Sequence, residues 1–103
     1  MIKVSGYSVF PEEVEALLIR HPAIQQVAVV GQIHPYRGEV TKAFVVLRPG
    51  AVLTPEDLIE WAQDHMAYYK VPREVVLVPS LPVSSTGKVM RRLLVDDSQL
   101  GKD

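Results

Sequence analysis

The sequence has no cysteine, no long apolar run and no large excess of either charge. The lack of cysteine excludes disulfides and thiolate chemistry, and it favours an intracellular, cytoplasmic location over a secreted one. No segment approaches the roughly 20 apolar residues that span a bilayer, so we expect no transmembrane segment. The 11 basic and 12 acidic side chains give a formal net charge of -1, so no overall field attracts nucleic acid.

What the sequence does contain is the composition of a small folded domain. Of its 103 residues, 48% are hydrophobic and 22% are charged, which is ordinary for a globular chain. We expect one domain over residues 1–103, with a frayed polar tail at residues 96–103. The opening "MIKVSGYSVF" already looks like the middle of a folded unit, so we interpret the chain as a fragment of a longer one.

The pattern of apolar residues predicts three helices and three strands. The helices are expected at residues 10–20, from residue 54 to near "YYKVP", and at residues 89–95; the strands are expected at residues 24–33, 40–48 and 73–78. Thr54, Pro55 and Asp57 form a strong helix start, and Gly31 marks the end of a strand or a bulge. This order predicts an α+β fold, in which helices cover a small antiparallel sheet of about three strands.

Helical spacing predicts which side chains face the core. The expected buried residues are Phe10, Val14, Leu17 and Leu18 in the first helix, and Leu58, Trp61, Ala62 and His65 in the second. Three carboxylates stand at the start of the first helix: Glu12, Glu13 and Glu15. We interpret them as partners of the helix dipole and as a solvated face, without acid–base chemistry.

Other residue types that often carry chemistry are scattered along the chain. The histidines lack the spacing of metal ligands: His21, His34 and His65. The following aromatic residues fall in expected core elements and are not interleaved with arginine: Phe44, Trp61, Tyr68 and Tyr69. We therefore predict neither a metal site nor a base-stacking platform on this chain.

The polar stretch "SSTGK" near the C-terminus is the first candidate site. A Walker-type phosphate loop requires a glycine five residues before the Gly-Lys pair and a Ser or Thr after it. Those positions hold Pro82 and Val89, so that motif is excluded. From the residues alone, Lys88 is either a solvated turn lysine or a mobile cation that stabilises phosphate or carboxylate oxygens.

The opening segment "KVSGY" is the second candidate site. Gly6 lies between Ser5 and Tyr7. It is either a turn glycine with a positive φ angle or a point at which the backbone passes close to a ligand. Both interpretations are open at this level.

Taken together, these segments resemble the C-terminal domain of the adenylate-forming enzymes, which include acyl-CoA synthetases, luciferases and peptide synthetase adenylation domains. The opening "IKVSGYSVFPEEVE" fits the family pattern, as do "HPAIQQVAVVG", "RGEVTKAFVVLRPG" and "YKVPREVVLV" in the middle and "LPVSSTGKVMRR" at the end. The resemblance covers nearly the whole chain. Two departures are that Val83 replaces a common lysine and that the chain begins after the family's hinge residue.

The resemblance implies a catalytic role for Lys88. In the family this lysine reaches the large N-terminal domain, which is missing here, and contacts the carboxylate and the α-phosphate as the acyl-adenylate forms. The resemblance also implies ATP, CoA and Mg²⁺ as cofactors, bound mostly by that N-terminal domain, and a carboxylic acid as substrate. Gly87, beside the lysine, is assigned with the cofactor-binding residues.

For the opening segment the resemblance implies a second role after the domain rotates. Ser5 and Gly6 would then line the path of the CoA pantetheine, and Lys3 would lie near the adenylate. The same small domain thus presents two different segments to two half-reactions. By itself it is expected to be inactive.

The segment "VFPEEVE" resembles the corresponding segment of fatty or aryl acyl-CoA ligases more than that of peptide synthetases. The resemblance therefore implies an acid–thiol ligase, as in fatty acid metabolism. The alternatives are a non-catalytic binding or regulatory module of the same fold, and the equivalent domain of a luciferase-like or peptide synthetase enzyme.

Overall fold

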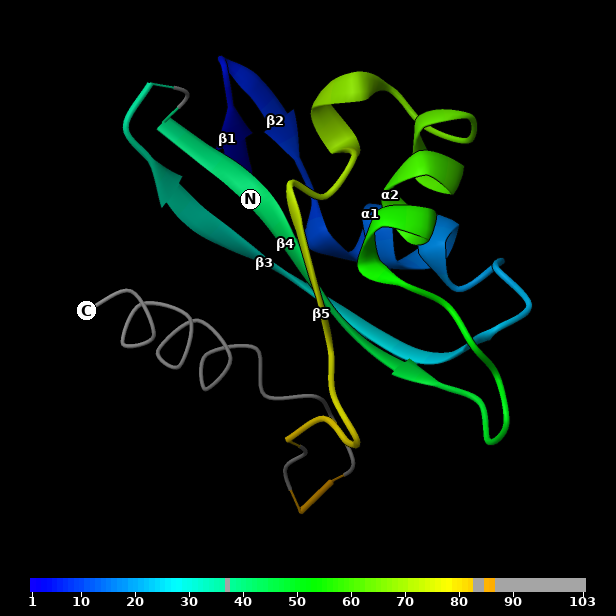
Figure 1. Cartoon of the computed structure of the whole chain (residues 1–103). Coiled ribbons are helices and arrows are strands. Elements are labelled where there is room, and N and C mark those ends of the chain that lie inside the picture. Colours follow the sequence, from blue (N-terminus) through cyan, green and yellow to red (C-terminus); the bar gives the residue numbers. More distant parts are fainter. Residues whose placement is uncertain (37, 83–84, 87–103) are drawn as a thin grey trace.

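The computed structural model describes residues 1–36, 38–82 and 85–86, so the helix predicted at residues 89–95 and the tail at 96–103 lie outside the described residues. The elements, in chain order, are β1 (Ile2–Val4), β2 (Tyr7–Val9), α1 (Pro11–Leu18), β3 (Ile24–His34), β4 (Gly38–Leu47), α2 (Pro55–Gln63), the 3₁₀ helix η1 (Tyr68–Lys70) and β5 (Glu74–Leu77) (Figure 1). Within these residues, no helix combines the length and the apolar character that crossing a bilayer requires.

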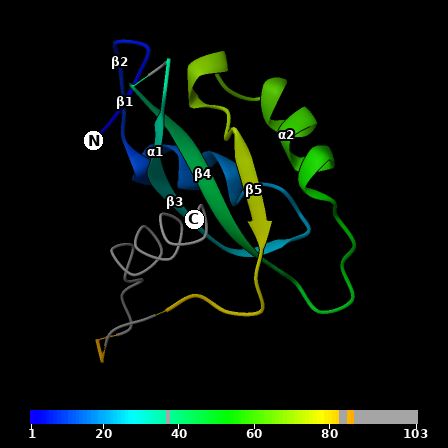
Figure 2. The same ribbon diagram turned by 60° about the vertical axis from the view of Figure 1, so that its left-hand side comes forward.

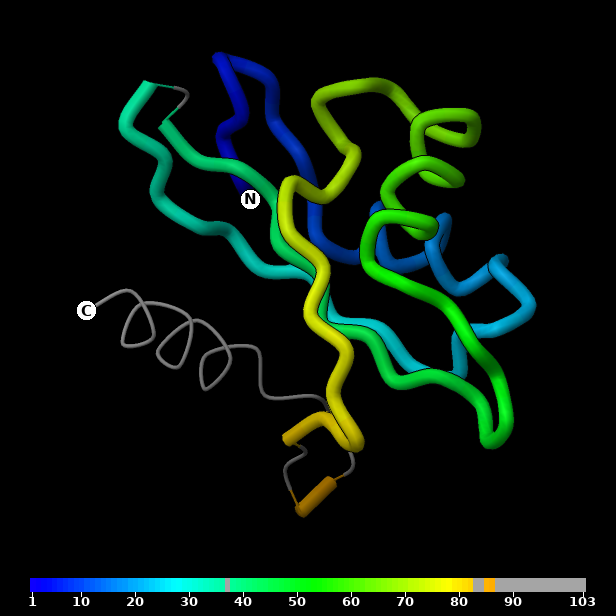
Figure 3. The backbone as a smooth tube through the Cα atoms, in the orientation of Figure 1, coloured from blue at the N-terminus to red at the C-terminus, as the bar shows by residue number. Residues whose placement is uncertain are grey.

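A long antiparallel hairpin of β3 and β4 is the main part of the sheet, with β4 at its centre and β3 at one edge (Figure 3). β1 and β2 form a short antiparallel hairpin that joins β4 where Val4 pairs with Gly38. β5 pairs with β4 in parallel, because α2 lies between them in the chain and returns it to the same end of the sheet. The α+β class is confirmed, but over the residues described here the sheet has five strands rather than about three.

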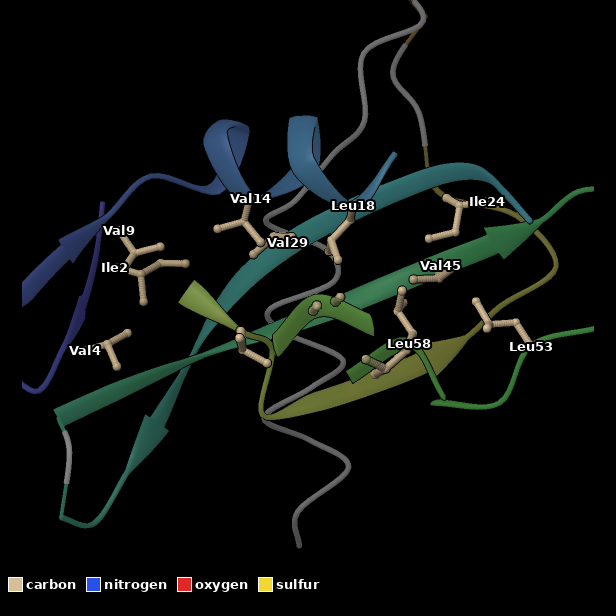
Figure 4. Close-up of a cluster of buried hydrophobic side chains, with 14 residues drawn as sticks. Ile2, Val4, Val9, Val14, Leu18, Ile24, Val29, Val45, Leu53 and Leu58 are labelled. Atoms are coloured by element: carbon tan, nitrogen blue, oxygen red, sulfur yellow. The ribbon is translucent and has the colours of Figure 1, made fainter. Parts of the chain in front are cut away.

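Both helices pack on one face of the sheet, α1 against β3 and α2 against β5 (Figures 1 and 2). Figure 4 shows Val14 and Leu18 directed from α1 toward Val29 of β3. Of the predicted buried residues of α1, Val14 and Leu18 are fully buried and Leu17 is partly buried. Phe10 is instead 51% exposed. It is the N-cap, with an extended backbone, so its side chain leaves the helical periodicity.

The helix α2 begins as the sequence predicted. The hydroxyl of Thr54 accepts a hydrogen bond of 3.1 Å from the backbone amide of Asp57. Leu58 and Ala62 are buried in the main core. His65 was expected on the buried face but is exposed, because it follows the last helical turn; its ring stacks on Trp61 with 3.9 Å between centroids.

The opposite face of the sheet carries a second, smaller apolar cluster: Ala28, Val30, Phe44, Val46 and Leu81. Lys42 is buried on this face beside Phe44, with its ammonium 5.2 Å from the ring centroid. Glu74 of β5 forms an ion pair with this ammonium at 3.6 Å. The buried cation therefore has both a carboxylate and an aromatic partner, as burial of a charge requires.

Candidate functional site: the first hairpin and its supports

Three of the five predicted site residues meet in one short hairpin. Lys3 lies in β1, and Ser5 and Gly6 connect β1 to β2. Gly87 and Lys88 lie outside the described residues. The geometry of the candidate site is therefore the geometry of the β1–β2 hairpin and of the elements that hold it.

The turn of this hairpin consists of only two residues. Val4 pairs with Tyr7, so Ser5 and Gly6 alone reverse the chain. Their φ angles are +49° and +88°, and two positive φ values in succession are typical of the tight type I′ turn. The prediction of a turn glycine at Gly6 is confirmed. A Cβ atom placed on Gly6 would meet no other atom within 4 Å, so the turn backbone borders open space.

Lys3 is held by two hydrogen bonds. Its backbone amide donates to Oε1 of Glu39 at 3.0 Å, which ties β1 to β4. Its ammonium donates to the hydroxyl of Ser8, the residue opposite it in the hairpin, at 3.2 Å. An ammonium has three donors, so Lys3 can hold Ser8 and still donate to an anionic group.

Gly31 makes room for the contact between Glu39 and β1. It lies inside β3 and pairs with Thr41, so it neither ends the strand nor marks the bulge, which falls near Gln26. A Cβ atom at Gly31 would lie 2.8 Å from Oε2 of Glu39. The prediction that Gly31 marks a strand end or a bulge is therefore wrong, and the glycine instead leaves room for the carboxylate of Glu39.

Beside the hairpin, three tyrosines form a cluster. The rings of Tyr7 and Tyr69 are stacked, with 4.1 Å between centroids and 6° between planes. Tyr68 meets both rings edge-on, at 6.1 Å from Tyr7 and 5.5 Å from Tyr69. Tyr68 and Tyr69 were expected in the core or at its rim, and the cluster is at the rim: Tyr68 is 70% exposed.

An ion pair joins η1 to α1, the helix that follows the hairpin. The ammonium of Lys70, in η1, donates to Oε1 of Glu13 in α1. This hydrogen bond raises the pKa of Lys70 above its ordinary value of 10.5. The sequence suggested only that Glu13 is a partner of the helix dipole, but in the structure it also holds Lys70. Glu15 also has a specific role, because its carboxylate accepts the amide of Val29 at 2.8 Å.

No group of three potential metal ligands gathers in the part of the chain that the structure describes. Two of the histidines instead serve local structure. His21 accepts the amide of Ala23 at 3.1 Å, and His34 accepts the amide of Tyr36 at 3.2 Å. The chemistry that the described site offers is thus the chemistry of a tight backbone turn, a lysine and nearby aromatic rings.

This domain geometry has counterparts among known proteins. Residues 13–88 match the family model of the AMP-binding enzyme C-terminal domain, and the chain belongs to that family. A crystal structure of a Brucella canis acyl-CoA synthetase superposes with a TM-score of 0.91 at 37% identity, and the match covers 99% of this chain and 19% of that one.

Two curated relatives are similar in sequence to nearly all of the chain. A long-chain-fatty-acid–CoA ligase of Bacillus subtilis is 42% identical over 97 residues, which cover 94% of this chain and 17% of the relative. A 4-coumarate–CoA ligase-like protein of Arabidopsis thaliana is 43% identical over 96 residues, which cover 93% of this chain and 18% of the relative. The chain thus spans about a sixth of the length of these relatives.

Proposed function

We propose that this chain is the C-terminal domain of an AMP-forming acyl-CoA ligase, with one domain over residues 1–103. Such an enzyme joins a carboxylic acid to ATP as an acyl-adenylate and then transfers the acyl group to the thiol of CoA. The observation that supports this best is the Ser5–Gly6 turn, whose two positive φ angles and open surroundings suit a close approach of ligand to backbone. The names of the similar proteins support the reaction class.

Lys88 is proposed as the catalytic cation of the first half-reaction. It is the last residue of the range that matches the family model. As the carboxylate attacks the α-phosphate, negative charge concentrates on the phosphate oxygens, and an ammonium offsets that charge. The residue beside it, Gly87, has no side chain, which would let the backbone come close to the phosphate.

The hairpin is proposed to act in the second half-reaction. The open backbone of Ser5 and Gly6 would line the pantetheine path, and Lys3 would direct a donor toward the adenylate. Because Gly6 has no side chain and open space beside it, the pantetheine could pass close to the backbone of the turn. A rotation of the domain between the two half-reactions would exchange Lys88 for the hairpin at the reaction centre.

The other binding sites of the reaction are proposed to lie in a second domain. We place the ATP, Mg²⁺ and carboxylic acid sites in an N-terminal adenylation domain, which this chain meets in the cytoplasm. A fatty acid ligase and a coumarate ligase-like protein match the chain about equally, at 42% and 43% identity. The choice of acid is therefore assigned to that partner domain.

The test is a fusion enzyme in which this chain replaces the matched C-terminal region of the Bacillus subtilis ligase. We expect the fusion to form acyl-CoA from a long-chain fatty acid, ATP and CoA, and the chain alone to form none. The N-terminal portion alone is the matched control. A fusion that releases no more pyrophosphate and forms no more thioester than the N-terminal portion alone would contradict the proposal and would favour a non-catalytic module of the same fold.

A further inference from the structure

The short helix η1 is held by three elements at once. Tyr69 stacks on Tyr7 of β2, and Lys70 forms its ion pair with Glu13 of α1. From β4, the hydroxyl of Thr41 donates to the carbonyl of Val71 at 3.2 Å and lies 3.4 Å from that of Lys70. We call these five residues, Tyr7, Glu13, Thr41, Tyr69 and Lys70, the η1 clamp.

The clamp ends next to the proposed pantetheine turn. Tyr7 directly follows Gly6, so the ring that stacks on Tyr69 is attached to the residue after the turn. Figures 1 and 2 show η1 beside the β1–β2 hairpin, and β2 and η1 are in contact. Among the described residues, the paired positions that join β1 to β4 are Val4 and Gly38, and the carboxylate of Glu39 adds a hydrogen bond from the amide of Lys3, so the turn itself lies beyond the last contact with the sheet.

The anchors of the clamp differ in rigidity. Thr41 is only 1% exposed and lies in the central strand, so it fixes the backbone of residues 70 and 71 to the sheet. The Glu13 and Lys70 side chains are 43% and 21% exposed, and the tyrosine stack lies at the rim. The contacts of η1 with Tyr7 and Glu13 are therefore more easily displaced than its contact with Thr41.

We propose that the η1 clamp positions the Ser5–Gly6 turn for the thioester-forming half-reaction. This inference rests on the proposed function. The residues of the clamp are positioning residues, because they act through the turn and not on the reacting atoms. A displaced turn slows transfer to CoA and leaves adenylation, which uses Lys88, unchanged.

The first test uses the 103-residue chain itself. The backbone order parameter of the Gly6 amide is measured by ¹⁵N relaxation in the unchanged chain and in Glu13→Gln, Lys70→Met and Tyr69→Leu. We expect the value to fall from about 0.85 toward 0.6 in each variant. The matched control is Glu74→Gln, which also removes a carboxylate from a lysine but on the opposite face of the sheet.

Rescue variants separate the clamp from a general loss of stability. Tyr69→Phe keeps the stacked ring, and the double exchange Glu13→Lys with Lys70→Glu keeps the ion pair with reversed charges. Both are expected to restore the order of Gly6. An order parameter at Gly6 that is unchanged in all three disrupting variants overturns the proposal.

The second test uses the fusion enzyme and separates the half-reactions. Pyrophosphate release reports adenylation, and transfer from preformed acyl-adenylate to CoA reports the second step. We expect Lys70→Met to lower transfer by about ten- to a hundredfold and to leave pyrophosphate release within about twofold. Equal losses in both steps, or none in transfer, overturn the proposal. If the unchanged fusion forms no thioester, the proposed function fails, while the relaxation experiment still decides the clamp.

Discussion

At the scale of single residues, the candidate site depends on backbone conformations that few side chains tolerate. Ser5 and Gly6 both have positive φ angles, at +49° and +88°. Glycine adopts this region without cost, whereas a Cβ atom is crowded by its own backbone. The open space around Gly6 means that any penalty for a side chain there comes from conformation and not from a clash.

The variant Gly6→Ala tests whether a side chain at this position carries a conformational penalty. We expect it to lower the free energy of unfolding of the chain by about 1 kcal/mol, because alanine is strained at positive φ. In thermal unfolding this corresponds to a fall of about 4–8 °C in Tm for a domain of this size. The matched variant Gly6→Asn should lose less, since asparagine tolerates left-handed backbone better. Equal stability of Gly6→Ala and the unchanged chain would show that the turn does not need its glycine.

Lys70 gives a prediction about pH. Its hydrogen bond to Glu13 raises its pKa above 10.5 in the folded state, so the folded chain retains this proton to higher pH than the unfolded chain. The resulting stabilisation is complete below pH 10.5 and is lost as the pH rises through the raised value. The stability difference between the unchanged chain and Glu13→Gln should therefore be constant from about pH 7 to 9 and shrink above about pH 10.5.

The measurement is urea unfolding of both chains across the pH range. A difference that grows above pH 10.5, or that never exceeds experimental error at neutral pH, would contradict a stabilising ion pair.

At the scale of elements, η1 depends on a buried hydroxyl as well as on its surface partners. Thr41 donates to the carbonyl of Val71 from the middle of β4, and the amide of Arg73 donates back to the carbonyl of Thr41 at 2.9 Å. This exchange joins the segment between α2 and β5 to the sheet. The position of η1 is thus set from below by the sheet and from the side by α1 and β2.

We expect Thr41→Val to lower the free energy of unfolding by about 1–3 kcal/mol, because it keeps the shape of the side chain but leaves buried carbonyls without their donor. Thr41→Ser keeps the hydroxyl and is the matched control, with a smaller loss that reflects one missing methyl group. Chemical unfolding of the three chains decides the point. The account of η1 fails if the valine variant is as stable as the serine variant.

The same elements show how far the sequence predicts the structure. β3, β4 and α2 were predicted because each is long enough to show a period or a cap, and Thr54 caps α2 as expected. β1 and β2 have three residues each, which is too short to show alternation, and η1 has the same length. The class of fold followed from the long elements, whereas the number of strands did not.

The candidate site was predicted less completely, for a related reason. Local signals and the family resemblance marked Gly6 and its neighbours. The residues that hold them are distant in the chain: Lys70 is 57 residues from Glu13, and Glu39 is 36 residues from Lys3. Such pairs depend on the packing of α1, β1 and η1 against one sheet, and no local pattern in the sequence indicates them. The exposed position of Phe10 likewise followed from where α1 begins.

At the scale of the whole molecule, the domain is small beside the enzymes that it resembles, at 17% to 19% of their length. Its proposed contribution is to supply two functional parts of one small domain, Lys88 and the Ser5–Gly6 turn. A rotation would then bring one or the other to a reaction centre in a larger partner. Loss of either segment should therefore affect only its own half-reaction.

The most direct test of this account is the rate of pyrophosphate release by the fusion enzyme with Lys88 intact and with Lys88→Ala. We predict that the substitution slows adenylation by at least about 100-fold, because one charge contact at the transition state is lost, while transfer from preformed acyl-adenylate to CoA stays within about threefold. Equal rates of pyrophosphate release for the two enzymes would contradict the assignment of Lys88 as the catalytic cation.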